Sequence, residues 1–555
     1  MLAFTGNSSE PVKIDMKADN SRLEKKAAAY RQKGQWLAAI NALETLVKID
    51  HKSLGYSLDL ANCYMQIESF DKAVEVYSKI FVLHPNEPLL AASFGGALLR
   101  LGKLGEAETL LLHSLSLDPK NIFARINLGG VYQAQGDLKA SLNNALEAVS
   151  VDPTCALAFN NLGSAFSDMA MFEQAKHAYG TAILLEPEQL DALINLGAME
   201  SRLGSSKNAI EMYERALLTL TANQTKRADA IRFFCSFEYL KEGNLEKAWD
   251  YYEGGFSSMV PLGGARSPKR IFSVPRWSGE SLEGKRLLIW REQGLGDELL
   301  FGTCLHELQE LNAGQIIIEC DPRLVPVLAR SFPNYIVRPQ GYHEQTLESF
   351  YNDFDFHLPI ASLMKFFRRK IEDFQRGGPY IVPNKELVNQ FNQRLRLFKD
   401  KTLVGICWRS GKLSPVRNLG YTMLNDWEFL KEKKHDYVFV NLQYGDCEAE
   451  LKEVEKEFEI NILRWPDVDL KDDLESVFSL TACLDMVIVP GTTVSAISGA
   501  LGVPTIYLSK KGWLWLGQDQ LPWFTSFYEL LAEGNVPVSD RLHEVGDLMD
   551  VIKLN

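Results

Sequence analysis

Apolar and small residues in the first half of the chain recur with a fixed period of 34 residues. Each period holds two amphipathic segments, with a small residue in the first and a proline after the second. A small residue lets the second helix pack closely on the first, and proline stops a helix and turns the chain. The pattern therefore predicts stacked helical hairpins. The small residues are Ala61, Gly95, Gly129, Gly163 and Gly197, and the prolines are Pro85, Pro119, Pro153 and Pro187.

Further positions keep the same period, among them Leu60, Phe94, Leu128, Leu162 and Leu196. The period and these co-registered positions resemble the tetratricopeptide repeat, which builds an α-solenoid. We count six units over residues 19–223. A degenerate seventh, "FEYLKEGNLEKAWDYYEGGF" at residues 237–256, is expected to cap the stack. Solenoids of this kind offer an extended concave surface, so a protein partner is expected.

The second half of the chain has a different texture, in which short apolar runs alternate with amphipathic helical segments. Runs such as "RLLIW", "QIIIEC", "TLVGICW" and "DMVIVP" are typical of strands buried on both faces, and the alternation predicts parallel sheets with crossover helices. A polar helical stretch at residues 384–401 separates two sets of runs, so we expect two Rossmann-like domains. The predicted parts are a flexible tail (1–18), repeats (19–255), a linker (256–284) and sheet domains (285–395 and 396–555).

Charge and composition narrow the classes of partner. The formal charge of −13 argues against the cationic face that binds nucleic acids or anionic membranes. No apolar run approaches the roughly 20 residues that span a bilayer, and the first residues lack a signal-peptide pattern. Eight cysteines are scattered without Cys-x-x-Cys or zinc-ligand spacing, as in reduced thiols of the cytoplasm. We expect a cytoplasmic protein that binds neither nucleic acid nor membrane and holds no metal.

The stretch "LLIWREQGLGDELLF", residues 287–301, predicts a strand, a glycine turn and the start of a helix. Ligands of open α/β sheets bind at the carboxyl ends of strands, where this turn lies. Gly294 and Gly296 do not complete a dinucleotide fingerprint, because Leu299 stands where the third glycine belongs. The turn also lacks the Gly-Lys-Ser/Thr ending of a phosphate-binding P-loop.

Several segments of the second half, taken in order, resemble the glycosyltransferase family that includes the lipopolysaccharide heptosyltransferases, and in particular its bacterial relatives fused to tetratricopeptide repeats. The segments are "WREQGLGDELLFGTCLHEL", "FDFHLPIASL", "VGICWRSG", "FVNLQYGD" and "TVSAISGALGVPTIYL". The resemblance implies a GT-B fold, with the active site between two Rossmann-like domains. It also implies that Asp297 is the base that deprotonates an acceptor hydroxyl. The alternative is that Asp297 caps the helix that follows it.

The same resemblance implies a donor site in the second sheet domain. Thr492, Thr493 and Ser495 begin a helix after a strand, where backbone N–H groups suit a phosphate leaving group. Cations near another strand end could neutralise that group's charge, and Gln443 could meet the nucleotide base. Gly294 and Gly296 would allow close substrate approach. The remaining donor-side candidates are Arg409, Ser410, Lys412 and Arg417, for which an ordinary surface role is the alternative.

Some positions depart from the family or remain ambiguous. Gly491 and Ala496 stand where many relatives carry an aspartate and a histidine, which puts a heptose-like sugar specificity in doubt. His357 is either a buried structural histidine or a substrate contact. Glu292 and Glu298 are expected to be solvated.

Three asparagines, Asn127, Asn161 and Asn195, recur with the repeat period. A ladder of carboxamides can bind a peptide backbone without reading its side chains, and a similar ladder occurs in protein O-GlcNAc transferases. The alternative is that these asparagines belong to the repeat consensus and join neighbouring repeats.

The family resemblance thus implies a nucleotide-sugar-dependent, metal-independent glycosyltransferase with no cofactor. The arrangement of parts resembles bacterial flagellin glycosyltransferases that attach nonulosonic acids, such as pseudaminic acid, to Ser or Thr. This resemblance implies flagellin as the acceptor, bound by the repeats, and a CMP-linked sugar as one candidate donor. The alternative is a scaffold whose repeats bind partners and whose second half has lost its chemistry. An O-GlcNAc transferase with a UDP-linked donor ranks lower, because its motif text is absent.

Overall fold

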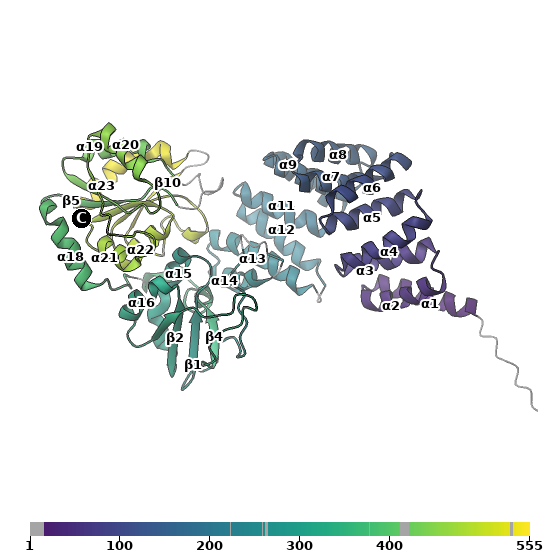
Figure 1. The fold of residues 1–555 in the computed structure, drawn as a ribbon, viewed down its shortest axis with the longest axis horizontal. Helices are drawn as coiled ribbons and strands as arrows, with labels where there is room; N and C mark the ends of the chain where they lie inside the picture. Colours follow the sequence, from purple (N-terminus) through teal and green to yellow (C-terminus); the bar gives the residue numbers. More distant parts are fainter. Residues whose placement is uncertain are drawn as a thin grey trace, which may run out of the picture. The chain divides into compact units, whose positions relative to one another are not determined.

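The computed structural model describes residues 16–221, 224–257, 259–260, 265–376, 378–410, 421–532 and 537–554. The chain divides after Ser205 into two compact units (Figure 1). Among the described residues, no helix combines the length and apolar character that crossing a bilayer demands.

The first unit is an array of helical hairpins, as the 34-residue period predicts (Figure 1). Each odd-numbered helix up to α9 packs against the even-numbered helix that follows it. The described helices are α1 (Met16–Gln32), α2 (Trp36–Ile49), α3 (Leu54–Gln66), α4 (Phe70–Leu83), α5 (Pro88–Arg100), α6 (Leu104–Leu117), α7 (Ile122–Gln135), α8 (Leu138–Val151), α9 (Ala156–Asp168), α10 (Phe172–Leu185) and α11 (Leu190–Arg202).

The repeated small residues lie where the two helices of a hairpin pack closely together, as predicted. A Cβ added at Gly163 would lie 2.6 Å from the ring of Tyr179, so α9 and α10 meet at a contact that excludes even a methyl group. Ala61 is fully buried at the equivalent position. Pro85, Pro119 and Pro153 each lie in a turn just after a helix, which confirms the predicted ends.

The second unit begins with three more helices, α12 (Ser206–Leu218), α13 (Thr225–Lys241) and α14 (Leu245–Tyr252). An aromatic cluster joins the hairpin α13–α14 to the sheet region that follows. The ring of Trp523 lies 6.4 Å from that of Trp249 and 5.9 Å from that of Phe301, and Phe237 packs edge-on against Trp513 at 5.8 Å. The hairpin predicted to cap the repeats is thus part of the second unit.

The first sheet has the order β3-β2-β1-β4, and all its described strands are parallel. Three residues of its strand β1, Leu287, Leu288 and Ile289, are fully buried. The strands are β1 (Arg286–Trp290), β2 (Gln315–Cys320), β3 (Ile336–Pro339) and β4 (Phe356–Pro359), and the helices are α15 (Leu295–Phe301), α16 (Val325–Ser331) and α17 (Met364–Phe367).

The second sheet has the order β10-β9-β8-β5-β6-β7 and is also parallel, so both predicted parallel sheets are present. Because the strands are parallel, their carboxyl ends share one edge of the sheet. The strands are β5 (Thr402–Ile406), β6 (Tyr437–Asn441), β7 (Ile462–Leu463), β8 (Met486–Pro490), β9 (Thr505–Lys510) and β10 (Phe527–Ala532). The helices are α18 (Lys385–Leu395), α19 (Phe429–Lys433), α20 (Glu448–Phe458), α21 (Leu474–Thr481), α22 (Thr493–Leu501) and α23 (Val545–Leu554).

The boundaries between parts differ from those predicted. Helix α1 begins at Met16, inside the expected tail. The division between compact units falls after Ser205, within the expected repeat region. Helix α18 belongs with the second sheet rather than the first, because Phe391 and Leu395 pack in the same cluster as Val440.

The described part of the expected linker is packed rather than loose. Arg266 is fully buried, and its guanidinium donates to Glu292 (Nε–Oε2 2.6 Å), Glu253 (2.9 Å) and the hydroxyl of Ser362 (2.8 Å). The expectation that Glu292 is solvated is therefore wrong. A buried arginine needs carboxylate partners, and Glu292 is one of them.

Candidate functional site

The glycine turn after β1 is held in a constrained conformation. Gln293 has a positive φ of 60°, unusual for a residue with a side chain. Its N–H donates to the carbonyl of Ser267 at 2.6 Å, and its side-chain amide donates to the hydroxyl of Tyr252 at 3.0 Å. Since Tyr252 ends α14, the last helical hairpin helps to fix this turn.

Asp297 lies in the first turn of α15 and is half-buried. Its Oδ2 accepts a hydrogen bond from the N–H of Gly294 at 3.0 Å. Gly294 is the N-cap residue, and Asp297 at the third helical position bonds back to it, so the capping alternative holds as a capping-box contact. A carboxylate in this position is also stabilised by the helix dipole.

The second predicted turn, after β8, begins α22. The N–H of Thr492 donates to Oγ of Ser495 at 3.3 Å, and that hydroxyl donates to the carbonyl of Thr492 at 2.7 Å. Ser495 therefore closes the first turn of its own helix. The Thr493 N–H lies at the first helical position, whose N–H has no acceptor within the helix.

The two turns meet. Helix α15 packs against α22, and a Cβ added at Gly296 would lie 3.8 Å from Cα and 3.9 Å from Oγ1 of Thr493. The start of α22 thus lies close to the turn that carries Asp297, at a distance that would place a Cβ at position 296 in ordinary van der Waals contact. Residues nearly 200 positions apart in the sequence, selected separately from it, lie side by side.

Two other predicted donor contacts are already engaged. Arg409 forms an ion pair with Glu450, and its Nη2 also donates to the carbonyl of Asp446 at 3.0 Å. Gln443 is buried, and its Oε1 accepts from the N–H groups of Trp408 (3.1 Å) and Arg409 (3.0 Å). Gln443 therefore ties the end of β6 to the end of β5, which leaves this oxygen occupied.

Of the three remaining donor-side candidates after β5, the structure describes Ser410. The hydroxyls of Ser410 and Tyr444 lie 3.4 Å apart. Lys412 and Arg417 lie outside the described residues.

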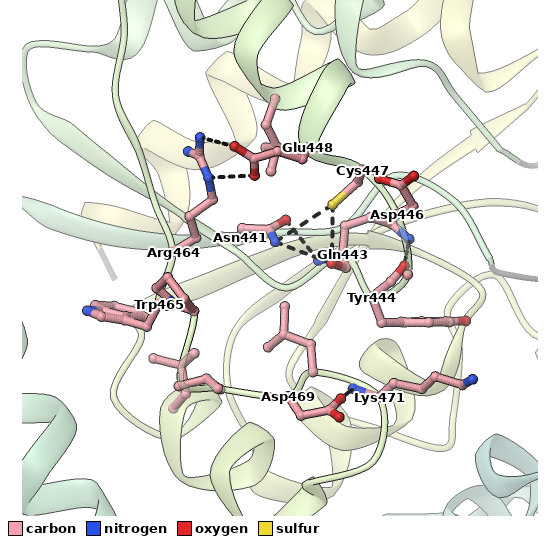
Figure 2. A pocket seen from close by; sticks show the side chains of 16 residues that line it. Asn441, Gln443, Tyr444, Asp446, Cys447, Glu448, Arg464, Trp465, Asp469 and Lys471 are labelled. Carbon is pink, nitrogen blue, oxygen red and sulfur yellow. Dashed lines mark hydrogen bonds and ion pairs between the residues drawn. The ribbon is translucent and has the colours of Figure 1, made fainter.

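A pocket of about 510 Å³ opens beyond the carboxyl ends of β6 and β7 (Figure 2). This is the sheet edge from which ligands of open α/β folds are usually bound, and the volume is in the range of small-molecule sites. The lining residues whose side chains carry polar or aromatic groups include Asn441, Gln443, Tyr444, Asp446, Glu448, Arg464, Trp465, Asp469 and Lys471.

The pocket combines flat rings with charged groups. Trp465 and Tyr444 lie on opposite sides of it in Figure 2. Arg464 pairs with Glu448 at 3.1 Å and with Glu455 at 2.8 Å, and these contacts fix the guanidinium at the pocket wall. Of these lining residues only Gln443 was predicted from the sequence. The run "RWPDVDLKDD" after the apolar "NIL" is a signal by which this strand end could have been found.

Glu298, expected to be solvated, is buried beside the turn. Burial raises its pKa to about 7, although Arg291 lies 2.9 Å away and favours the charged form. The expectation of solvation is wrong because the side chain turns inward and accepts from the N–H of Asp321 at 3.1 Å.

His357 is held as a neutral structural group. The indole N–H of Trp290 donates to its Nδ1 at 3.1 Å, and its ring stacks on Phe272 with 3.9 Å between centroids. Burial and two nearby arginines lower its pKa to about 3. An acceptor nitrogen under a stacked ring favours the structural alternative over a substrate contact.

The three repeat asparagines bridge neighbouring repeats. The Nδ2 of Asn127 lies 3.5 Å from the carbonyl of Ala92, that of Asn161 3.4 Å from the carbonyl of Ile126, and that of Asn195 3.0 Å from Oδ1 of Asn160. Each contact spans 35 residues along the chain. These contacts favour the alternative in which the ladder stabilises the repeat array.

The described residues contain no group of three or more His, Cys, Asp or Glu side chains arranged to hold a metal ion. Gly491 is exposed at the turn before α22, and a Cβ there would lie 2.9 Å from the hydroxyl of Tyr507. Ala496 is buried in α22. Neither position supplies a polar side chain to the turn.

Comparison with known proteins identifies the repeats. A family model described as the tetratricopeptide repeat matches residues 25–88 and 166–225. Protein FlbA of Caulobacter vibrioides is 32% identical over 297 residues, which cover 51% of this chain and 49% of FlbA. The chain thus spans about half the length of this curated relative.

Solved structures are similar to part of the chain. The crystal structure of MamA is 23% identical, covers 29% of this chain and 95% of its own, and superposes with a TM-score of 0.26. That of TTC0263, a tetratricopeptide-repeat protein of Thermus thermophilus, is 18% identical, covers 34% of this chain and 100% of its own, and gives a TM-score of 0.31. The chain thus contains tetratricopeptide repeats at residues 25–88 and 166–225, and its second unit carries two parallel sheets.

Proposed function

We propose that this chain is a protein O-glycosyltransferase of the GT-B type that moves a sugar from a nucleotide-activated donor to a Ser or Thr hydroxyl. One observation carries the proposal. The turn bearing Asp297 lies against the start of α22 through Gly296 and Thr493. A pocket of about 510 Å³ opens at the same edge of the second sheet from which α22 begins.

The proposed reaction is a displacement at the anomeric carbon. The acceptor oxygen forms a bond to that carbon, and Asp297 takes the hydroxyl proton. The bond from the anomeric carbon to the phosphate oxygen breaks, and its electron pair leaves with the nucleotide. The N–H groups at the start of α22 and the hydroxyl of Thr493 suit the charge on that phosphate. No step requires a metal ion or a cofactor.

In this proposal the pocket binds the nucleoside part of the donor. Trp465 offers a ring on which a base can stack, and Lys471 brings a positive charge to the lining, whereas the charge of Arg464 is balanced by Glu448 and Glu455. A CMP-linked sugar, including a nonulosonic acid such as pseudaminic acid, remains the donor proposed from the motif resemblance.

The repeats supply the acceptor in this proposal. A chain bound by the repeats is held at a high effective concentration near the catalytic unit. Flagellin is the acceptor that the arrangement of parts favours. Since the asparagine ladder is occupied by contacts between repeats, other groove residues would carry most of the recognition.

Two contacts of the predicted site residues support the alternative that the chain is a scaffold without catalytic activity. Asp297 spends one oxygen on a helix cap, and Arg409 is neutralised by Glu450. A protein that had lost its chemistry would retain both contacts as structural ones. The two functions differ in whether the pocket takes a nucleotide.

The deciding experiment has two arms. The full chain is titrated with CMP, UDP, GDP and ADP by calorimetry, and flagellin co-expressed with the chain and a nonulosonic acid pathway is analysed by intact mass. A glycosyltransferase binds at least one nucleotide and adds the mass of a sugar to flagellin. Binding of flagellin without nucleotide binding or added mass would favour the scaffold.

A further inference from the structure

We propose that Arg323 is a positioning residue that connects the rim of the nucleotide pocket to the turn carrying Asp297. The inference rests on the proposed function. Arg323 lies in a short 3-10 helix (Pro322–Leu324) directly after β2 of the first sheet. Its contacts run in two directions, one to each half of the proposed site.

The first set of contacts reaches the second sheet. Nη1 of Arg323 donates to the carbonyl of Lys471 at 3.0 Å and lies 3.3 Å from Oδ1 of Asp472. Lys471 lines the pocket. The rim is itself a closed turn, because Oδ1 of Asp469 accepts from the N–H groups of Lys471 (2.8 Å) and Asp472 (3.0 Å). Arg323 therefore holds an ordered segment of the pocket wall.

The second set of contacts leads back to α15. Arg323 donates two hydrogen bonds to the carboxylate of Asp321, from Nε to Oδ1 at 2.9 Å and from Nη2 to Oδ2 at 3.1 Å. Asp321 accepts from Arg291 at 3.2 Å, and Arg291 lies 2.9 Å from Glu298. The N–H of Asp321 also donates to Glu298 at 3.1 Å. Glu298 is the neighbour of Asp297.

This chain of charges is stiff because most of it is buried. The side chains of Glu298, Asp321 and Arg291 expose only 3%, 9% and 13% of their surface. Separating a buried charge from its partner is strongly unfavourable, so these groups keep their contacts when the rim or α15 shifts. A nucleotide that reduces the motion of the rim would thereby also reduce the motion of the turn that carries Asp297.

The proposal makes a distinctive kinetic prediction. Every residue that lines the pocket belongs to the second-sheet region, and Asp469 closes the rim turn without Arg323, so Arg323→Gln should leave nucleotide affinity within about twofold. The turn of Asp297 would lose its link to the rim. A displacement on the order of 1 Å of a catalytic group can cost about a hundredfold in rate, so kcat should fall at least tenfold with the donor KM unchanged.

Arg330 provides a matched control within the same short stretch. It also crosses from the first sheet region to the second, with two bonds to Glu475 at 3.0 Å and 2.7 Å. Its contacts with the described residues are to Glu475 and the carbonyl of Val382, and they include neither Asp321 nor the pocket rim. Arg330→Gln therefore weakens the attachment of the two sheet regions without cutting the proposed link.

The experiment compares the full-length wild type, Arg323→Gln and Arg330→Gln. Each is titrated with CMP, UDP, GDP and ADP, and hydrogen exchange of residues 293–299 is followed with and without the nucleotide that binds. Donor kcat and KM and the melting temperature are measured in parallel. We expect nucleotide to protect residues 293–299 in the wild type and in Arg330→Gln, and to leave them unprotected in Arg323→Gln.

Two results would overturn the link. One is an Arg323→Gln variant that shows nucleotide-dependent protection and a kcat like the wild type. The other is a parallel loss of nucleotide affinity and melting temperature in both variants, which would mark Arg323 as merely structural. Failure of the wild type to bind any of the four nucleotides would instead refute the proposed function, and the link with it.

Discussion

The N–H of Gly294 donates to Oδ2 of Asp297 at 3.0 Å, so the proposed base also caps its own helix. The cap and the base make different demands on the side chain. A cap needs a hydrogen-bond acceptor, whereas a base needs a group that takes up a proton.

Asparagine at position 297 separates these roles, because its side-chain oxygen can still accept from Gly294. We expect Asp297→Asn to melt near the wild type and to lose about 10²- to 10⁴-fold in transfer rate, the usual contribution of general base catalysis. Asp297→Ala should lose the activity and also about 1 kcal/mol of stability through the missing cap. Transfer assays and thermal melts of both variants test this. Retained transfer in Asp297→Asn would leave Asp297 with the cap alone.

Trp465 is expected to contribute to nucleotide binding through its ring. Base stacking on an aromatic side chain contributes about 1–3 kcal/mol, so Trp465→Ala should raise the nucleotide Kd by roughly 5- to 150-fold. Trp465→Phe keeps an aromatic face and should lose much less. Calorimetric titration of both variants measures the difference. Equal affinities in all three proteins would exclude the ring from the binding site.

Equivalent glycines of the repeats should respond differently to alanine. At Gly163 an added Cβ would lie 2.6 Å from the Tyr179 ring, whereas at Gly129 the nearest atom is the Ser141 carbonyl oxygen at 3.6 Å. We expect Gly163→Ala to destabilise the array by about 1–3 kcal/mol through overpacking. Gly129→Ala should be neutral or stabilising by up to about 1 kcal/mol, because alanine favours the helix. Urea unfolding followed by circular dichroism measures both, and equal midpoints would contradict the packing argument.

Glu298 should make the stability of the second unit depend on pH. Its pKa rises from 4.5 to about 7 on folding, because burial disfavours the charged carboxylate. The folded chain therefore holds this proton more tightly than the unfolded chain does. The contribution is complete below pH 4.5 and is lost as the pH rises through about 7, on the order of 3 kcal/mol in total.

Glu298→Gln removes the titration and keeps an acceptor for the N–H of Asp321. The wild type should lose stability relative to this variant as the pH rises from 4.5 to 8. Tryptophan fluorescence is a suitable probe, because nine of the ten tryptophans lie after Ser205 and Trp36 alone lies before it. Stability curves that run parallel across this pH range would show that Glu298 does not titrate there.

The unit boundary predicts which fragments fold. A chain of residues 206–555 keeps the hairpin α13–α14 and its aromatic contacts, so we expect it to be soluble and to melt cooperatively. A chain of residues 256–555 loses Trp249, Phe237 and the Glu253 partner of Arg266. It should aggregate or melt without cooperativity. Scanning calorimetry of the two fragments tests this, and a well-folded shorter fragment would contradict it.

The sequence predicted those features that repeat or that follow from local pattern. The period of 34 residues located the hairpins through residues such as Gly163 and Pro153, because the same contacts recur in every unit. Continuous apolar runs such as "RLLIW" located the buried parallel strands. The two glycine- and threonine-bearing turns were identified separately from motifs, and their meeting through Gly296 and Thr493 agrees with that interpretation.

Features that depend on contacts distant in sequence were not predictable. Arg266 reads as part of a polar connector, yet it is buried because Glu292 and Glu253 converge on it from other segments. Glu298 also looks solvated from the sequence, but in the fold it is buried against Asp321 and Arg291, which come from other segments. Trp465 and Lys471 carry no motif, since a pocket wall is defined by the strands that surround it rather than by local spacing.

The attachment of α13 and α14 to the sheets has a consequence for how such proteins diversify. Three aromatic contacts join this hairpin to the region that follows it, namely Phe237–Trp513, Trp249–Trp523 and Tyr252–Phe301. Hairpins upstream of Ser206 can therefore be duplicated or deleted by recombination without rebuilding the contacts that hold this hairpin on the sheets. The length of the helical array can therefore change in evolution while the sheet region stays the same.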